Sequence, residues 1–481
     1  MQRMLRDVIP LSRIVAYIRH GTAAKATIAF VTLIEQRLGG QFVYDSHQFP
    51  LGRPELRDLH MLSETLMRHR VIKKFVRSIT QPDEPPVRSW IAELCSKSKQ
   101  FAEGLSSRDD RYAMTAALAE ALERYIWSEV DDYFRSPFTS TAHKAATKNA
   151  VGVDRFVGFS SEIRAHDKKL QLNPEAQYTW IRGYSWVSRT RVYIPAQIVS
   201  AAYFRAMRKK TEPIIRFPIT TGLATWPTRE GTVLSGALEI IERDAFMIMW
   251  LNQLTLPRIA WTGLRQYESL DYLLRKCAQY RLTPHLIDLI TDAPARAACV
   301  VVEDKSDEGP PITVGLKAGT SLAHAAEGAL LEALRARRTA RFKKRQNKWV
   351  PDTKPADVHQ WQRVLYWSEK ERYKNLSFLY AGSVQEYSKA AWENETKEEH
   401  LSRIIDWCRG AGYECASVDL GQSAKNPTPW HIAMVVIPEL QPMHHSEQHP
   451  YTDGIRVQAI PQKFGYTART VPFFEEPHPF V

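Results

Sequence analysis

Three segments combine apolar residues with regularly placed glutamates, and each is predicted to be a helix. Apolar side chains occur nearly all round each segment, which is typical of a helix that is largely buried. The three segments are Thr115–Tyr125, Leu234–Asp244 and Glu327–Arg338. They align on their central glutamates, and in each the residue four positions earlier is small. The central glutamates are Glu120, Glu239 and Glu332, and the small residues are Ala116, Ser235 and Gly328.

Short β-branched runs between and after these helices predict buried strands. One segment, from Thr190, is expected to begin as a strand and to turn helical after Pro195. The other predicted strands lie within Thr283–Asp292, Ala297–Asp304, Tyr413–Leu420 and His431–Leu440. This order predicts a mixed α/β or α+β fold in which helices cover the sheets. Residues 1–60 are interpreted as a helical and mixed N-terminal extension, and the proline-rich stretch Thr80–Trp90 as a hinge between segments.

Two of the helices carry a second glutamate three residues after the first, at Glu123 and Glu242. Residues three or four apart share one helix face, so the two carboxylates of each pair lie together. A solvated face with intrahelical Glu–Arg pairs is one interpretation. The apolar surroundings favour another, because buried carboxylates are costly unless a cation neutralises them. Oxygen ligands suit Mg²⁺, which usually shares its shell with substrate phosphates.

Arginines accompany these glutamates on all three helices and are candidates for charge-assisted contacts with phosphates. They are Arg124, Arg243, Arg335 and Arg337. The chain contains neither a GxxxxGK[ST] motif nor the HRD and DFG set of protein kinases, so the P-loop and protein-kinase classes are excluded. The predicted site is therefore a magnesium–nucleotide site of another kind.

Composition restricts the class further. The 481 residues are 44% apolar and 25% charged, which is typical of a globular protein with a sizeable core. No apolar run approaches the roughly 18 residues that span a bilayer, and the N-terminus lacks a signal-peptide pattern, so no membrane association is expected. Five scattered cysteines without a CxxC favour the reducing cytoplasm. The net charge of +12 alone does not support a nucleic-acid partner, so none is expected.

Two local features keep two interpretations each. The basic tract Arg335–Lys348 is interpreted as a solvated helix face, with a phosphate-binding surface as the alternative. The loop holding His444, His445 and His449 is interpreted as solvated, with a metal site as the alternative.

Several motifs in order resemble the YcaO-domain family. The stretch Thr220–Trp250, "TTGLATWPTREGTVLSGALEIIERDAFMIMW", is similar to its signature: a TGLA-like turn, a short link, and a helix that ends in ERDA. The stretch "MTAALAEALERY" resembles the family's first glutamate helix, and "EGALLEALRARR" its third. The resemblance covers roughly residues 60–481, so residues 61–481 are expected to form one catalytic domain of YcaO type.

The resemblance implies an ATP- and Mg²⁺-dependent enzyme that activates backbone amides of a ribosomally made precursor peptide. In the azoline-forming branch, known from bacteriocin and microcin biosynthesis, a Cys, Ser or Thr side chain closes a thiazoline or oxazoline ring. Thioamide formation, amidine formation and a non-catalytic scaffold subunit are the alternatives. Glu120, Glu123, Glu239 and Glu242 resemble the family's magnesium ligands. Ser235, Arg243, Glu332 and Arg337 resemble its nucleotide contacts.

The last residues, "EEPHPFV", resemble the proline-alternating tail of the family's peptide cyclodehydratases. Alternating prolines favour an extended backbone, and the tail is predicted to reach the active site rather than to fray. The catalytic candidates there are Pro477, His478, Pro479 and Val481. The resemblance also implies a separate E1-like partner that binds the leader peptide, a flavin dehydrogenase in some systems, and a homodimer or hetero-complex.

The chain departs from the family pattern at four places. Ala116 replaces a usual Ser, and "FAEGLSS" (Phe101–Ser107) lacks the Lys of a common GKG turn. Arg335 stands where Gln is usual, and Trp226 replaces a small residue in the turn before the second helix. Because every expected glutamate is present, metal binding is better supported than nucleotide affinity or substrate class.

Overall fold

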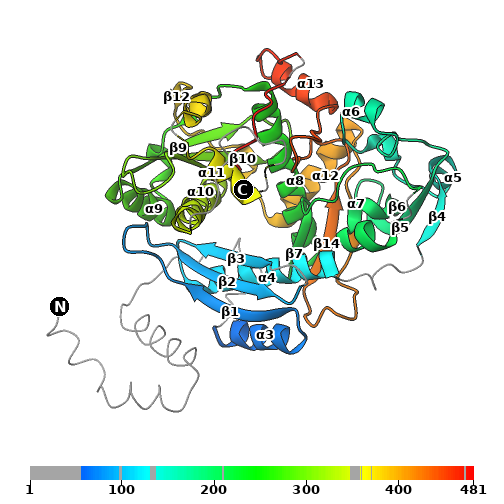
Figure 1. Cartoon of the computed structure of the whole chain (residues 1–481), viewed down its shortest axis with the longest axis horizontal. Helices are drawn as coiled ribbons and strands as arrows, with labels where there is room; N and C mark the ends of the chain where they lie inside the picture. Colours follow the sequence, from blue (N-terminus) through cyan, green and yellow to red (C-terminus); the bar gives the residue numbers. More distant parts are fainter. Residues whose placement is uncertain are drawn as a thin grey trace. The chain divides into compact units, whose positions relative to one another are not determined.

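The computed structural model describes residues 56–96, 100–129, 137–208, 211–346, 358, 360–369, 371–470 and 473–480. The division expected near residue 60 stays a prediction, since residues 1–55 lie outside the described part. The α/β fold is confirmed: in the described residues, three mainly antiparallel sheets are covered by helices, with one short parallel pair between β8 and β12 (Figure 1).

Sheet A is a three-stranded antiparallel meander between two helices. Helix α3 (Leu56–Arg68) precedes it, and α4 (Asp110–Glu129) follows it. Its strands, in sheet order, are β1 (Ile72–Ser78), β2 (Arg88–Leu94) and β3 (Phe101–Ser106).

Sheet C repeats that order of elements. Helix α9 (Glu268–Gln279) precedes an antiparallel meander, and α10 (Leu322–Arg345) follows it. The meander consists of β9 (Leu282–Leu289), β10 (Arg296–Asp304) and β11 (Ile312–Gly319). Two short strands, β8 (Arg258–Ile259) and β12 (Val384–Gln385), extend the sheet beyond β9, so that β11 is an edge strand.

Sheet B combines strands from distant parts of the chain in the order β4-β5-β13-β14-β7, with β6 also paired to β5. The strands are β4 (Phe138–Thr141), β5 (Gln177–Ser185), β6 (Arg191–Pro195), β7 (Leu223–Trp226), β13 (Ala416–Asp419) and β14 (His431–Val436). The remaining helices are α5 (Ala142–Ala146), α6 (Ser161–His166), α7 (Ala196–Val199), α11 (Gln360–Tyr366), α12 (Lys397–Ala411) and α13 (Ile455–Lys463). The strands predicted from β-branched runs are confirmed as β6, β9, β10, β13 and β14.

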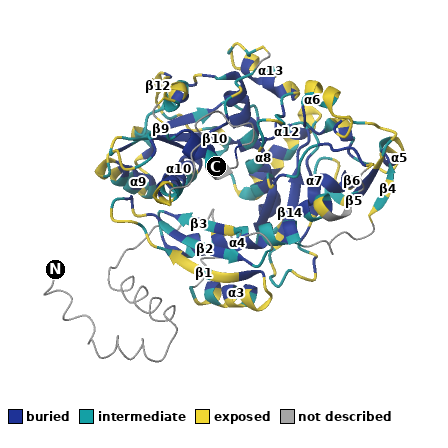
Figure 2. Cartoon of the chain, viewed as in Figure 1, coloured by how far each residue is buried: buried dark blue, intermediate teal, exposed yellow. Residues whose placement is uncertain are grey.

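The long helix α8 (Arg229–Asn252) connects sheets B and C and is buried along most of its length (Figure 2). Its N-terminal half packs against β14 through residues such as Ala237, which share a core with Val435. Its C-terminal half packs against sheet C, where Phe246 and Trp250 share a core with Val314. Glu239 and Glu242 therefore lie where the helix passes from one sheet to the other.

The structure corrects two expectations. The proline-rich stretch is no hinge. Residues 79–87 form the loop between the paired strands β1 and β2, and Asp83 and Glu84 in this loop pair with Arg341 of α10. The basic tract is not a wholly solvated face in its described part, whereas the phosphate-binding alternative stays a prediction. Arg338 pairs with Glu103 of β3, so arginines of α10 hold sheet A against sheet C.

Candidate functional site

The site lies where the edge strands of all three sheets meet the three glutamate helices. Each helix presents a glutamate whose carboxylate accepts a backbone N–H from the neighbouring sheet edge. The N–H of Glu103 in β3 donates to Glu120 Oε2 at 2.8 Å. That of Leu316 in β11 donates to Glu332 Oε2 at 3.4 Å. We call Glu120, Glu123, Glu239, Glu242 and Glu332 the glutamate cluster.

The two glutamates of α8 accept N–H groups from two different sheets. The N–H of Gly222, just before β7, donates to Glu239 Oε2 at 2.9 Å, and that of Ala318 in β11 donates to Glu242 Oε2 at 2.7 Å. Gly222 has φ +90°, and a Cβ there would lie 2.3 Å from the carbonyl oxygen of Val435. This turn before β7 therefore requires glycine, because L side chains rarely adopt that φ and space is lacking.

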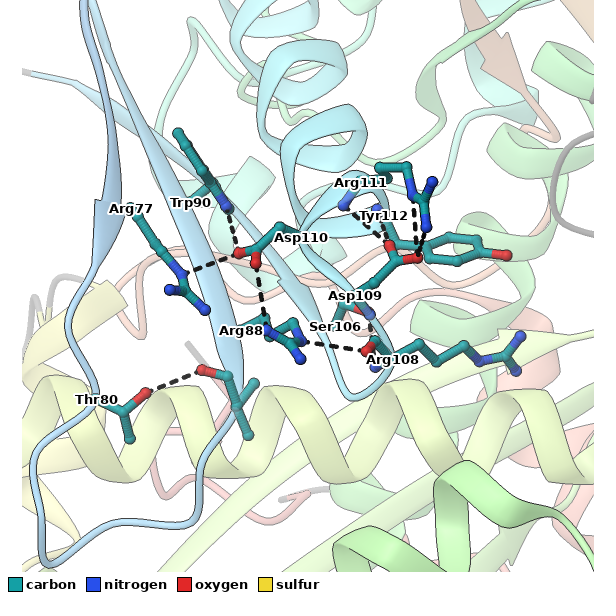
Figure 3. Close-up of polar contacts among 11 residues, drawn as sticks. Arg77, Thr80, Arg88, Trp90, Ser106, Arg108, Asp109, Asp110, Arg111 and Tyr112 are labelled. Atoms are coloured by element: carbon teal, nitrogen blue, oxygen red, sulfur yellow. Dashed lines mark hydrogen bonds and ion pairs between the residues drawn. The ribbon is translucent and has the colours of Figure 1, made fainter. Parts of the chain in front are cut away.

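The start of α4 is fixed by two consecutive aspartates (Figure 3). Asp109 caps the helix, since its Oδ1 accepts the N–H groups of Arg111 and Tyr112 at 2.9 and 3.2 Å. The buried Asp110 accepts Trp90 Nε1 at 2.8 Å and pairs with Arg77 at 3.0 Å. These contacts fasten α4 to sheet A and so set the position of Glu120 and Glu123.

Charge repulsion within the cluster is evident at Glu123 and Glu332. The pKa of the half-buried Glu123 is raised well above its ordinary value by desolvation and by the charges of Glu120 and Glu239. The pKa of Glu332 is also raised, by desolvation and by Glu242, although Arg335 acts in the opposite direction. These glutamates of different helices therefore lie close enough for their charges to interact.

Each helix also brings one arginine to the cluster. Arg124 pairs with Glu120 at 2.5 Å, and Arg335 lies 3.8 Å from Glu332. Arg243 pairs with Glu242 and lies 3.4 Å from Glu239. Burial alone would lower the pKa of Arg243, but Glu242 and Glu239 outweigh it and raise that pKa.

The other nucleotide candidates are placed differently. Ser235 lies one turn before Glu239 on α8 and is half-buried. Arg337 is buried and pairs with Asp304 at 2.7 Å, at the end of β10. Its guanidinium is thus engaged outside the cluster, and we leave Arg337 out of the proposed nucleotide site.

The C-terminal tail is docked on α8 and α11. Trp250 Nε1 and Trp367 Nε1 donate to the carbonyl oxygens of Glu476 and Pro477 at 3.2 and 2.8 Å. The ring of Phe480 lies 4.3 Å from the guanidinium carbon of Arg243, within the range of a cation–π contact. The tail therefore reaches the glutamate cluster through Phe480, while Val481 lies outside the described residues.

His478 is completely enclosed rather than presented to the cluster. Its Nε2 lies 3.1 Å from the carbonyl oxygen of His444, and its pKa is held well below the ordinary value by desolvation and by Arg363. The expectation of a solvated histidine loop is wrong at two positions. His444 is buried beside Glu447, 3.0 Å away, and His449 packs against the rings of Phe159 and Phe217.

Sequence reasoning missed three parts of the site. One is the contact of Phe480 with Arg243. The second is the buried pair of Asp244 with Arg456, joined at 2.7 Å. The third is Glu327 of α10, which accepts Arg108 Nη2 at 3.2 Å from the β3–α4 loop. The aspartate of the ERDA motif pointed to Asp244. No sequence signal pointed to the Phe480–Arg243 or Glu327–Arg108 contacts, because their partners are far apart in the chain.

Trp226, one of the departures from the family pattern, has a local explanation. A Cβ at Gly231, in the first turn of α8, would lie 2.0 Å from the Trp226 ring, so the glycine provides the space. Lys397, the first residue of α12, places its Nζ 4.1 Å from the centroid of the Trp226 ring. The large residue is therefore accommodated by its neighbours without displacing α8.

A comparison with protein families decides the classification. The model of the family described as "YcaO cyclodehydratase, ATP- and Mg²⁺-binding" matches residues 106–441, more than half of the chain. The chain belongs to the YcaO family. Its three glutamate helices all lie within the matched region, and no curated protein matches it in sequence.

Solved structures share the YcaO fold. A heterocyclase in complex with substrate and cofactor superimposes with a TM-score of 0.69 and 18% identity, over 87% of this chain and 57% of that one. YcaO from Methanopyrus kandleri, bound with AMPPCP and Mg²⁺, superimposes with a TM-score of 0.57 and 16% sequence identity, over 82% of this chain and 93% of that one. A chain of the E. coli microcin synthetase McbBCD complex superimposes with a TM-score of 0.54 and 13% sequence identity, over 76% of this chain and 87% of that one. This chain thus spans little more than half of the first heterocyclase.

Two further results concern the described residues as a whole. No helix among them combines the length and hydropathy that crossing a bilayer requires. No three His, Cys, Asp or Glu side chains in that part of the chain already converge to metal-binding distance. The carboxylates of the cluster are instead directed to backbone N–H groups and arginines, as described above.

Proposed function

We propose that this YcaO chain is an ATP-dependent cyclodehydratase that forms thiazoline or oxazoline rings from Cys, Ser or Thr in a ribosomally made precursor peptide. The observation that carries the proposal is the meeting of three glutamate helices, each with one arginine, beside the docked tail. Family membership supports the ATP and Mg²⁺ requirement.

The residues of the cluster fit Mg²⁺ in their chemistry. Carboxylate oxygens are the ligands that this hard cation prefers. The repulsion that raises the pKa of Glu123 is relieved when a divalent cation binds nearby. We propose Glu120, Glu123, Glu239 and Glu242 as its ligands, with Ser235, Arg124, Arg243, Glu332 and Arg335 around the nucleotide. Bound Mg²⁺ would neutralise charge on the phosphates.

The chain's own residues supply positioning and positive charge. The guanidiniums of Arg124, Arg243 and Arg335 stand as counter-charges for the γ-phosphate, a role that arginines perform in phosphoryl transfer. Transfer to the amide oxygen leaves ADP and an O-phosphorylated amide. The Cys, Ser or Thr side chain adds to the carbonyl carbon, and inorganic phosphate departs with the former amide oxygen. The side-chain and amide protons are released, so the net loss is that of one water.

The docked tail is proposed to shape the active site. Pro477 and Pro479 keep it extended, and Phe480 covers one face of Arg243. His478, enclosed and neutral, is proposed to anchor the tail through His444 rather than to transfer protons. Val481 remains a proposed active-site residue.

A separate protein is proposed to bind the leader of the precursor, and the known McbBCD complex supports such an assembly for this fold. A flavin dehydrogenase would act after ring formation. All five cysteines are free, which supports a cytoplasmic location.

Calorimetric titration of Mg·ATP into the full chain tests the proposal, beside the double variant Glu239→Gln, Glu242→Gln. We expect magnesium-dependent binding that the variant loses by at least about tenfold, since charged ligands are removed. The matched control is Glu398→Gln, an exposed position of α12. Equal binding by variant and parent would contradict the site.

The chemistry is tested by incubating chain, leader-binding partner, ATP and a Cys-containing precursor, and weighing the peptide. Loss of 18 Da per ring is the expected result of losing one water. A gain of sulfur for oxygen would instead indicate the thioamide branch, and unchanged mass without phosphate release would indicate a scaffold.

A further inference from the structure

A pocket lies on sheet B, and no residue of the glutamate cluster lines it. It has a volume of about 510 Å³ and is formed by β5, β6, β13, β14 and the first turn of α8. Three arginines from three elements line it: Arg182 of β5, Arg191 of β6 and Arg229 of α8. We call it the arginine pocket. Its one acidic lining residue is Asp419, which is bonded to its own loop through the N–H of Gly421 and through Gln422 Nε2.

The three guanidiniums have no acidic partner. Within the described part of the chain, none of Arg182, Arg191 and Arg229 forms an ion pair with a carboxylate, whereas most arginines of the core do. Glu230, the acidic residue nearest to Arg229 in the sequence, is exposed and forms no ion pair with a described residue. The pocket therefore carries an excess of positive charge that no group of the described chain neutralises.

One of the arginines is held in place by aromatic rings. The guanidinium carbon of Arg229 lies 4.6 Å from the ring centroid of Tyr184 and 4.8 Å from that of Trp186. Trp186 is itself fixed, because its Nε1 donates to Ser417 Oγ at 2.9 Å. Arg182, Arg191 and Arg229 are all solvent-exposed, but the two rings restrict the guanidinium of Arg229, so that it loses less entropy than a freely rotating side chain when it binds an anion.

We infer that the arginine pocket docks an acidic segment of a peptide. A guanidinium fork matches the geometry of a carboxylate, and successive same-side residues of an extended peptide stand about 7 Å apart, a spacing that suits separate arginines. A nucleic acid favours a continuous basic track along its phosphates, and here Asp419 interrupts the pocket. The inference rests on the proposed function in one respect, namely that a peptide is the partner.

Fluorescence anisotropy with two labelled twelve-residue peptides, one alternating Glu and Ser and one alternating Gln and Ser, tests the inference on the full chain without ATP. We expect the Glu peptide to bind more tightly, and its affinity to fall with added salt. Each of Arg182→Gln and Arg191→Gln should weaken it about three- to fivefold, as one solvent-exposed charge pair allows. The matched control is Arg57→Gln on α3, which is exposed and has no ion pair, and it should change nothing.

Equal affinity of the parent for the two peptides would overturn the inference. Equal affinity of the parent and the double variant Arg182→Gln, Arg191→Gln for the Glu peptide would overturn it as well. Tighter binding of a twelve-nucleotide RNA than of the Glu peptide would overturn the assigned partner. Mg·ATP titration of the same double variant separates the two proposals. Retained nucleotide binding with lost peptide binding assigns the pocket to docking alone, while failure of the parent to bind Mg·ATP would count only against the proposed function.

Discussion

Asp244 follows Arg243 directly in the chain, yet it serves the glutamate cluster from inside the protein. Its carboxylate is fully buried and accepts three hydrogen bonds from Arg456 and one from the N–H of Gln441 at 2.8 Å. The pair joins α8 to α13 on the side of α8 that faces the core. At the scale of single residues, the site thus depends on a buried ion pair as well as on the groups that face it.

Replacing Arg456 by Met leaves Asp244 charged and without its partner. Breaking a buried pair in this way costs about 3–5 kcal/mol of unfolding free energy. Urea denaturation followed by tryptophan fluorescence measures it. Arg456 also pairs with Asp292 at 2.8 Å, and Asp292 keeps Lys463 as a second partner at 3.2 Å. The double variant Asp244→Asn, Arg456→Met should therefore recover part of that loss, because the uncompensated charge of Asp244 is gone. Recovery of none of it would show that the ion pair is not the cause.

The residues of the cluster were predictable to the extent that helical spacing expresses them. A period of 3.6 places Glu239 and Glu242 on one helix face, and it does the same for Glu120 and Glu123. The family resemblance added Glu332 as a nucleotide contact. The contact of Phe480 with Arg243 was not predictable, because spacing does not show which distant segment packs on a helix. Arg337 illustrates the opposite limit: its position in the motif did not reveal that Asp304 engages it.

At the scale of elements, the β9–β10 hairpin contains a half-buried carboxylate, Asp288, that responds to pH. Burial raises the pKa of Asp288 to about 6, although Arg296 of the paired strand, 2.6 Å away, opposes the shift. Because the pKa is raised in the folded protein, the protonated Asp288 carboxyl contributes to the free energy of unfolding, and this contribution is fully present below the ordinary pKa of 3.8. It is lost as the pH rises through about 6.

The variant Asp288→Asn should therefore be more stable than the parent at pH 8, by at most about 3 kcal/mol for a shift of roughly two units. Near pH 4 the two should have the same midpoint, since the parent is then largely protonated. Thermal unfolding across pH 4–8 checks both ends of that range. The exposed Asp307→Asn in the next loop is the control, and its difference from the parent should not vary with pH.

At the scale of the whole described unit, two similar helix–meander–helix units are joined by ionic contacts. Arg341 of α10 is buried and pairs with Asp83 and, at 2.9 Å, with Glu84 in the β1–β2 loop. Arg338 and Glu327 of the same helix contact β3 and the loop before α4. Because Glu120 and Glu123 lie on the first unit and Glu332 on the second, these contacts hold the parts of the cluster together.

Replacing Arg341 by Gln should leave each unit folded but loosen their junction. Hydrogen exchange should increase in the β1–β2 loop and at the start of α4, while β10 in the centre of sheet C stays protected. The proposed Mg·ATP affinity should fall about tenfold or less, because the proposed ligands themselves remain and only their alignment is weakened. Uniformly faster exchange throughout sheet C would indicate general destabilisation instead.

The glutamate cluster has a second consequence, for solubility. An edge strand offers free N–H groups on which another chain can add a strand, and such edges lead to aggregation unless they are covered. In this protein, carboxylates of the cluster bond to N–H groups at the edges of all three sheets. Variants that remove these carboxylates should therefore expose unpaired strand edges as well as remove the proposed magnesium ligands. Precipitation of a Glu→Ala variant would then report on the sheet edges before it reports on catalysis.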